Sequence, residues 1–294
     1  MDECFSAAAT IDSYSIEFIC QKLNKERDLR NLVKKFKRYS ASDVFRAQAG
    51  IYETTVRRLA SENCFEWIEE ILEHQKKFKD DVSKVNFNAR LIRLYGQSRM
   101  FDCAKKVFDE MPERNCKITV RPLNALLSAC LYARKYDEME AIFKEMEMKW
   151  KVKPSVVSYN IMIEGFCKMG KVDSALALFD DMVRKSEVNP NLISFNTLLK
   201  RLYLDKRFGD GENMWKQMVK WNLIPNIISY NTRLDALVDE KKLDEARKLI
   251  DEMGQNGIKT DVITDIMFKT IKKQFCVLFC FRSSPELSIV AELK

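Results

Sequence analysis

The chain has 294 residues, 46% of them apolar, and a formal net charge of +7. This apolar content excludes a mainly disordered chain, and the small number of glycines and prolines (eight and six) favours long helices with short turns. The charge permits a polyanionic partner without requiring one. The longest apolar run, residues 275–281, is much shorter than the ~20 residues of a membrane-spanning helix, so no membrane association is expected.

The two ends of the chain carry little pattern. Residues 1–23 form a poorly defined N-terminal segment, and residues 24–48 predict the remnant of a degenerate helical hairpin, with Asn24 to Tyr39 as its second helix. The first 19 residues contain four acidic residues and no Lys or Arg, which does not fit an organelle transit peptide or a secretory signal. Residues 262–294 predict a partial repeat followed by a divergent C-terminal cap.

One short phrase recurs between these ends. It reads Ser-Tyr-Asn or a close variant, and its asparagines, at positions 124, 160, 196 and 231, lie 36, 36 and 35 residues apart. A period of this length indicates stacked helical hairpins, each too small to bury its own apolar face. The frame gives about six repeats over 49–261: 49–84, 85–119, 120–155, 156–191, 192–226 and 227–261.

Within each repeat the apolar residues follow helical spacing. The first helix of the 156–191 repeat places Tyr159, Met162, Ile163 and Phe166 on one stripe, and its second helix repeats the pattern with Ala175 at the start. Arg233 breaks the equivalent stripe in the last repeat. Gly170 is predicted to be a left-handed C-cap. Serines 158, 194 and 229 are predicted N-caps, and prolines 154, 190 and 225 are predicted to stop the second helices.

The segment 156–170, together with Ala175, Phe179, Met182 and Pro190-Asn191, closely resembles the pentatricopeptide repeat (PPR) motif. The match covers 120–261 well and 49–119 more loosely, and residues 91–111 resemble small plant organellar members built only of plain repeats. The resemblance implies an all-α, right-handed α-solenoid of helix-turn-helix repeats. It also implies a non-catalytic protein that binds single-stranded RNA at one base per repeat, in organellar RNA metabolism or translation.

The family's base-reading pairs are the fifth and last residues of a repeat. In the family's code, Asn with Asp leans to uracil and Asn with Asn or Ser leans to cytosine, so a short pyrimidine-rich strand is implied. The second residue of each repeat is expected to stack on the bases, with Arg121 departing from the usual aliphatic residue. The pairs are Asn124 with Ser155, Asn160 with Asn191, Asn196 with Asn226 and Asn231 with Asp261; the stacking residues are Arg121, Val157, Ile193 and Ile228.

Two observations weaken an independent RNA-binding role. The earlier repeats pair Ala89 with Thr119 and Glu53 with Lys84, of which alanine cannot read a base and glutamate would repel RNA. Near the asparagines, Lys168 and Lys200 are candidate phosphate contacts, but Glu164, Asp235 and Asp239 balance them. We therefore expect weak binding alone, strengthened by a partner such as a mitochondrial ribosome or another RNA-binding protein.

Alternatives remain open at this stage. A single Asn near a helix start is usually a local cap or a solvated residue, and only the repetition argues otherwise. The chain is alternatively a structural or accessory component of a mitochondrial ribosome that docks on protein or folded rRNA, or a peptide-binding adaptor. Family habit implies the mitochondrion, which the N-terminus does not support; otherwise the chain belongs to another intracellular compartment.

The sequence contains no motif that indicates catalysis or metal binding. The sequence has no Gly-rich phosphate loop, deaminase signature or nucleophile elbow. The nine cysteines include no CxxC pair, which fits buried, reduced thiols. Cys276 and Cys280 make a poor metal site, and His74, the only histidine, is expected at the surface. No enzyme activity, cofactor or metal is expected.

Overall fold

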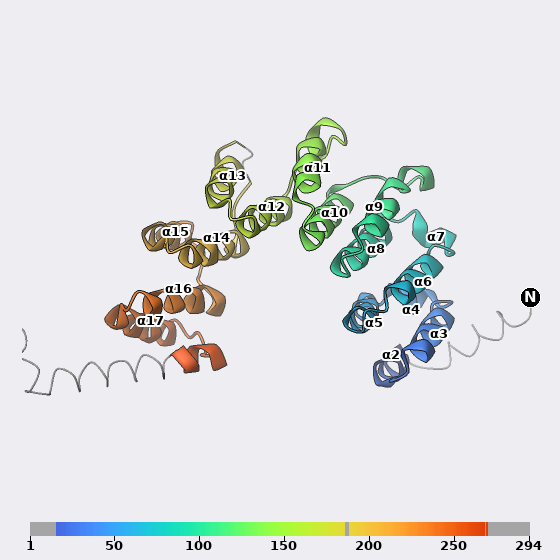
Figure 1. Ribbon diagram of the computed structural model, residues 1–294, viewed down its shortest axis with the longest axis horizontal. Coiled ribbons are helices and arrows are strands. Elements are labelled where there is room, and N and C mark those ends of the chain that lie inside the picture. Colours follow the sequence, from blue (N-terminus) through green and yellow to red (C-terminus); the bar gives the residue numbers. More distant parts are fainter. Residues whose placement is uncertain (1–15, 186–187, 268, 270–294) are drawn as a thin grey trace, which may run out of the picture. The chain divides into compact units, whose positions relative to one another are not determined.

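A computed structural model describes residues 16–185, 188–267 and 269, and none of these residues lies in a β-strand. The chain divides into two compact units, residues 1–162 and 163–294, with the division inside helix α12 (Val156–Lys168). Each unit is a series of helical hairpins, which Figure 1 shows with the helix labels used below. The predicted all-α fold is confirmed for the described residues. Cys276 and Cys280, judged above to be a poor metal site, lie outside them.

Unit 1 begins with a short helical region and continues as hairpins of a first and a second helix. Its helices are α2 (Ile16–Lys25), α3 (Leu29–Tyr39), α4 (Asp43–Ala47), α5 (Ala49–Ser61), α6 (Phe65–Gln75), α7 (Lys79–Val82), α8 (Val85–Gln97), α9 (Phe101–Asp109), the 3₁₀ turn η1 (Pro112–Arg114), α10 (Val120–Ala133), α11 (Tyr136–Met148) and the first part of α12.

Unit 2 repeats the same hairpin. Its helices are the remainder of α12, α13 (Val172–Arg184), α14 (Leu192–Leu204), α15 (Phe208–Lys220), α16 (Ile227–Asp239) and α17 (Leu243–Gln255), and residues 262–267 are also helical.

The first helix of each hairpin begins at the first residue of a repeat in the frame defined above. Helices α5, α8, α10, α12, α14 and α16 begin at residues 49, 85, 120, 156, 192 and 227. A further helical segment begins at Val262, which is the first residue after the last repeat. The repeat frame therefore gives one position number to equivalent residues, and position five is the same place on every first helix.

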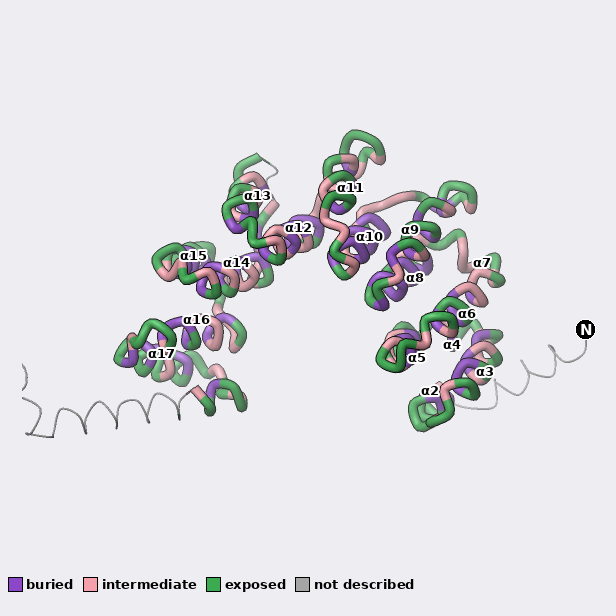
Figure 2. The backbone as a smooth tube through the Cα atoms, in the orientation of Figure 1, coloured by how far each residue is buried: buried purple, intermediate pink, exposed green. Residues whose placement is uncertain are grey.

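The core of each unit lies between the helices. In Figure 2 the buried residues follow the helix surfaces that face neighbouring helices. Small residues allow the closest approaches: a Cβ added to Gly96 on α8 would lie 2.7 Å from the Cβ of Ala129 on α10, and one added to Gly211 on α15 would overlap the ring of Tyr203. These contacts explain why a small residue recurs where helices meet.

The turn inside each hairpin uses a left-handed residue. Gly170 has φ +75°, as its predicted C-cap role requires. The equivalent Arg134, Lys206 and Lys241 have φ between +56° and +60°, so they hold the same turn without glycine. A residue with a Cβ is less stable there, which leaves room to stabilise three of the hairpins.

The N-cap residues lie three positions before the predicted serines, and the serines occupy position N3. Asn191 and Asn226 cap α14 and α16, and each forms a capping box with the serine at N3, Ser194 or Ser229. In α12 the amide of Ser155 donates to Ser158 Oγ over 2.9 Å in the same arrangement. The prediction was wrong because serine and asparagine are both good caps, and the sequence offers both within four residues.

Three other local predictions need correction. The expected helix from Asn24 to Tyr39 is interrupted, because Asp28 accepts hydrogen bonds from the amides of Arg30 and Asn31 and starts α3. The second helices end at residues 148, 184 and 220, five or six residues before the prolines, which lie in the following loops. His74 is half-buried, with its ring edge-on to Phe78 at 5.7 Å, and burial lowers the pKa of its imidazole.

Arg233 has a structural explanation. Its guanidinium donates to both carboxylate oxygens of Glu212, at 2.9 and 2.6 Å, and lies 4.7 Å from the centre of the Trp215 ring. Burial opposes ionisation of Glu212, but the hydrogen bonds from Arg233 outweigh it and lower the pKa of the carboxyl. An ion pair therefore replaces an apolar contact between α15 and α16.

Candidate nucleic-acid interface

The asparagines at position five lie in a repeated hydrogen-bond arrangement. The Nδ2 group donates to the last residue of the same repeat: Asn124 to Ser155 Oγ at 3.3 Å, Asn196 to Asn226 Oδ1 at 3.3 Å, and Asn231 to Asp261 Oδ1 at 3.1 Å. The structure thus joins the two members of three predicted pairs directly. Each pair links the start of one first helix to the start of the next.

These amides neither enter the apolar core nor cap a helix. Asn124, Asn196 and Asn231 are half-buried, and Asn160 is more enclosed at 8% exposure. The helix caps in unit 2 are the last residues of the repeats, Asn191 and Asn226. Asn124, Asn196 and Asn231 are therefore held in place by hydrogen bonds and keep part of their surface exposed to solvent.

Aliphatic side chains at position two lie beside the amides and point to solvent. Val157, Ile193 and Ile228 are 50%, 62% and 59% exposed, although residues of this type are usually buried. Ile263 continues the series at 54% exposure, and it was not predicted because the repeat that begins at Val262 is incomplete. Exposed aliphatic surfaces at one repeat spacing can hold flat rings between them.

Unit 2 has a groove of about 530 Å³ on this side of α12, α14 and α16. Its lining includes Ile193, Asn196 and Ile228, with Lys168 and Lys200 at its edge. Lys168 pairs with Glu164 at 2.8 Å, whereas Lys200 is exposed. The groove therefore combines apolar surfaces, an amide and a modest positive charge.

Unit 1 has a groove of about 420 Å³ in the equivalent place, and its chemistry differs. Its lining contains Asn124 and Val157 together with Arg90, Arg93 and Arg121. Arg121 donates to Asn86 Oδ1 at 2.6 Å, which joins position two of one repeat to position two of the next. Arg90 and Arg93 were not predicted from the sequence, although Arg93 is four residues after position five and so shares its helix face.

Glu53 does not present a free negative charge. Arg93 Nη2 lies 2.5 Å from its Oε1, so position nine of one repeat neutralises position five of the preceding repeat. The expectation that Glu53 would repel RNA therefore needs correction. Position five of the 85–119 repeat is Ala89, so these two repeats carry an ion pair and an alanine where the later repeats carry asparagines.

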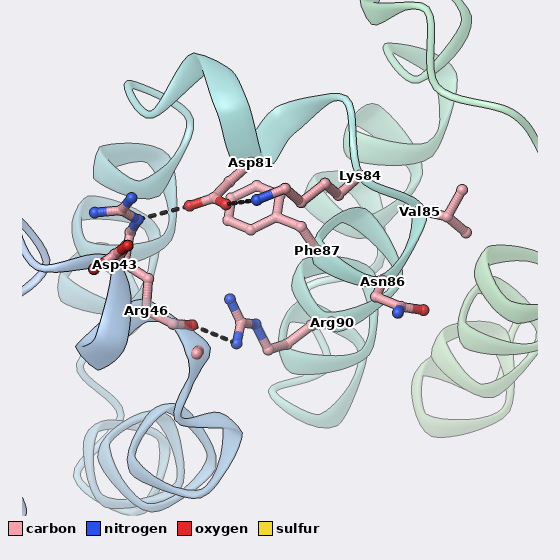
Figure 3. A pocket seen from close by; sticks show the side chains of 9 residues that line it. Asp43, Arg46, Asp81, Lys84, Val85, Asn86, Phe87 and Arg90 are labelled. Carbon is pink, nitrogen blue, oxygen red and sulfur yellow. Dashed lines mark hydrogen bonds and ion pairs between the residues drawn. The ribbon is translucent and has the colours of Figure 1, made fainter. Parts of the chain in front are cut away.

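A second cavity of unit 1, about 650 Å³, lies between α4, α7 and α8 (Figure 3). Asp81 accepts from Arg46 Nε at 2.6 Å and from Lys84 Nζ at 2.7 Å, and Arg90 Nη1 donates to the Arg46 carbonyl at 2.8 Å. Burial would raise the pKa of Asp81, but the hydrogen bonds from Lys84 and Arg46 outweigh it and the pKa is lowered. Asp81, Arg46 and Lys84 therefore form an ion-pair cluster in this cavity.

The protonation states of an acidic residue and of two buried cysteines also follow from their surroundings. Asp261 is held as a carboxylate, because the backbone amide of Thr264, the Thr264 hydroxyl and Asn231 lower its pKa. Burial raises the pKa of Cys130 and of Cys167, each to about 12, so both remain thiols. Among residues 16–185, 188–267 and 269, no cluster of three metal-ligating side chains occurs. Within the same ranges, no helix is long and apolar enough to cross a bilayer.

Helical hairpins that repeat every 35 or 36 residues define this chain as an α-solenoid protein. Family models match successive stretches of it: the PPR repeat family at 154–203, 190–238 and 225–271, the pentatricopeptide repeat domain at 106–169, and the PPR repeat at 90–116. Together they span residues 90–271, well over half of the chain. The chain belongs to the pentatricopeptide repeat family.

Its relatives include proteins of Arabidopsis thaliana. It is 48% identical over 165 residues to small ribosomal subunit protein mS79 (rPPR3b), covering 56% of this chain and 42% of that protein. It is 42% identical over 174 residues to small ribosomal subunit protein mS78 (rPPR3a), covering 56% and 44%. The chain therefore aligns with less than half of the length of these relatives.

Solved structures share the fold. The pentatricopeptide repeat protein PPR10 in complex with an 18-nt psaJ RNA element has a TM-score of 0.55 and 18% identity, covering 92% of this chain and 38% of that one. The PPR domain of Arabidopsis thaliana protein-only RNase P 1 in complex with tRNA has a TM-score of 0.52 and 17% identity, covering 62% and 95%. At these identities the likeness concerns the fold.

Proposed function

We propose that this chain binds a short, pyrimidine-rich single strand of RNA along the first helices of its repeats, at one base per repeat and without catalysing a reaction. The observation that carries the proposal is the repeated pair of Asn at position five with the last residue, seen as Asn124–Ser155, Asn196–Asn226 and Asn231–Asp261. A primary amide offers a donor and an acceptor, which suits the Watson–Crick edge of a pyrimidine.

The neighbouring groups fit the same ligand. Ile193 and Ile228 line the unit 2 groove together with Asn196. We infer that a base whose edge meets the amide would lie between these two aliphatic side chains. Lys200 at the groove edge would contact a phosphate. The residues proposed to bind bases are Asn124, Ser155, Asn160, Asn191, Asn196, Asn226, Asn231 and Asp261, with Arg121, Val157, Ile193, Ile228 and Ile263 beside the rings.

We further propose that the chain acts in the mitochondrion as a partner of the small ribosomal subunit. This second role is favoured by the names of its relatives, small ribosomal subunit proteins mS79 and mS78. The arginines of unit 1 support it, because they can contact the phosphates of folded RNA without reading its sequence. The two roles are compatible, since a docked protein gains local concentration for a weak single-strand contact.

The base-reading role is tested by fluorescence anisotropy with a labelled strand containing CCCU against a strand of A alone, at fixed salt. The expected result is tighter binding of the pyrimidine strand, and loss of that preference in a variant carrying Asn160→Ala and Asn196→Ala. Asn213→Ala, which removes an exposed amide on the second helix α15, is the matched control and should keep the preference. Equal binding of the two strands by the wild type would contradict the proposal.

The ribosomal role has its own test. Organelle lysate is separated on a sucrose gradient, and the chain is followed by immunoblotting with and without RNase treatment. Sedimentation with the small subunit is expected. A chain found only in the free fractions would contradict this role and leave the anisotropy result unaffected.

A further inference from the structure

A hydroxyl from the next repeat donates a hydrogen bond to each of the three paired amides. Ser158 Oγ donates to Asn124 Oδ1 at 2.6 Å, Ser229 Oγ donates to Asn196 Oδ1 at 2.8 Å, and Thr264 Oγ1 donates to Asn231 Oδ1 at 2.8 Å. All three hydroxyls occupy position three of their repeats. The same contact is thus seen at these places, of which one lies in unit 1 and two lie in unit 2.

Burial and backbone hydrogen bonds hold these three hydroxyls in place. Ser158 and Ser229 are fully buried, and Thr264 is 1% exposed. Each accepts a backbone amide: Ser155 N at 2.9 Å, Asn226 N at 3.2 Å and Asp261 N at 3.3 Å. The hydroxyl proton is therefore left to donate to an oxygen. In unit 2 it lies between the asparagine Oδ1 and the last residue of the repeat, where Asn226 Oδ1 is at 3.1 Å and Asp261 Oδ1 at 2.9 Å.

The two anchors fix the orientation of the amide. The asparagine oxygen accepts from the hydroxyl, and its nitrogen donates to the last residue of its own repeat, so exchanging oxygen and nitrogen would place donor against donor. One N–H and one lone pair remain for a ligand. Because the amide orientation decides which of these faces which base atom, the hydroxyl contributes to specificity without touching the base.

In the sequence, the asparagine of one repeat and the hydroxyl of the next repeat occur together. Each asparagine at position five is followed, in the next repeat, by a hydroxyl at position three: Ser158, Ser194, Ser229 and Thr264. Where position five is Glu53 or Ala89, position three of the next repeat is Phe87 or Pro122, which have no hydroxyl. Helix capping alone does not require this correspondence.

We propose that the position-three hydroxyl is a positioning residue for the base-reading amide of the preceding repeat. The choice of base at one nucleotide then depends on three residues across a repeat boundary: position five, the last residue, and position three of the next repeat. This inference rests on the proposed base-reading function.

The test substitutes Ser229→Ala in the full chain and compares it with Ser229→Thr, because Thr264 already makes the equivalent bond. The first measurement is the order parameter of the Asn196 side-chain amide, obtained from ¹⁵N relaxation of the RNA-free protein. The second is the affinity ratio between strands that differ only in C or A at the nucleotide whose preference changes in Asn196→Ala. Ser229→Ala should lower the order and reduce the ratio about fivefold, the effect of one ordinary hydrogen bond, and Ser229→Thr should keep both.

Two controls separate positioning from helix capping. Ser42→Ala removes the cap hydrogen bond that Phe45 N donates to Ser42 Oγ, at the start of α4, which carries no base-reading asparagine, and should leave both measurements unchanged. Ser158→Ala should change the ratio only at the nucleotide that responds to Asn124→Ala. Unchanged amide order or an unchanged ratio in Ser229→Ala would overturn the inference. If the wild-type protein shows no preference for C over A, the proposed function is overturned instead. The order parameter of the Asn196 amide would still show whether the Ser229 hydroxyl holds that amide.

Discussion

The same hairpin carries different chemistry in the two units. In unit 1 the groove is lined by Arg90, Arg93 and Arg121 and contains one amide of the row, Asn124. In unit 2 the groove is lined by Asn196 and by two exposed isoleucines, and its charged lining residues are Lys168, Lys200, Arg201 and Glu164. The backbone of the repeat is shared, so the difference lies in a few positions of each first helix. One region is suited to phosphates and the other to base edges.

One repeat of unit 2 packs its first helix differently from the other repeats. Position seven of the first helix is a buried leucine in three repeats of the two units (Leu91, Leu126 and Leu198), and it is Arg233 in the last repeat. Arg233 keeps its charge by pairing with Glu212, and both side chains are 18% exposed. Loss of either partner of such a pair leaves a buried charge without its counter-charge, whereas a leucine at this position has no charged partner to lose.

The largest expected effect follows from that pair. Glu212→Ala leaves the Arg233 guanidinium largely buried without its carboxylate, and we expect the free energy of unfolding of unit 2 to fall by about 3 kcal/mol. Urea unfolding followed by circular dichroism measures it. The double variant Glu212→Leu with Arg233→Leu, which copies the leucine of unit 1, should recover most of the loss. A single variant as stable as wild type would contradict the role given to the pair.

The difference in charge predicts a difference in salt dependence. Replacing Arg121 with Gln, which leaves the Arg93–Glu53 ion pair intact, should weaken RNA binding equally for all sequences and reduce the slope of log affinity against log salt by about one, for one phosphate that is no longer neutralised. Asn196→Ala should change the preference between strands and leave the slope unchanged. Anisotropy titrations at several salt concentrations make both measurements. The comparison of the two grooves fails if the arginine variant changes base preference instead.

Acid should weaken the ion pair of unit 2. The pKa of Glu212 is lowered in the folded state from the usual 4.5, so its contribution to stability is present above that pH and is lost as the pH falls through the folded value. The stability difference between wild type and Glu212→Gln should therefore be largest above pH 4.5 and should shrink in acid. Urea unfolding over a pH series tests this, and a constant difference would contradict it.

The smallest expected effect concerns the hairpin turns. Arg134→Gly should stabilise unit 1 by about 0.5–1 kcal/mol, because φ is +59° there and glycine adopts that conformation without a steric cost. Gly170→Ala should destabilise by a similar amount, since its φ is +75°. Gly209→Ala in α15, where an added Cβ meets nothing within 4 Å, should stabilise by contrast. Thermal unfolding ranks the three variants.

Much of the fold was predictable from the sequence because spacing decides it. The phase of the asparagines fixes the repeat frame, and every first helix from α5 to α16 begins where that frame places it. The frame also places position five beside the last residue of each repeat. What spacing could not give was the identity of the capping residue, because Asn226 and Ser229 are both good caps and only the structure shows their reciprocal bonds.

The candidate site was less predictable for a related reason. Arg93 and Glu53 lie 40 residues apart, and nothing local in the sequence indicates that they pair. The hydroxyl behind each amide was present in the repeated phrase, but its helix-start position suggested only a cap. Side-chain partners across a repeat boundary are set by the stacking of hairpins, which sequence spacing predicts only coarsely.

The structure of the full chain bound to a CCCU-containing strand tests the central claim most directly. The account predicts a pyrimidine edge within hydrogen-bonding distance of the Asn196 amide, with its ring between Ile193 and Ile228 and the Ser229 hydroxyl still on Asn196 Oδ1. A strand lying along the second helices, or bases turned away from the asparagines, would contradict it.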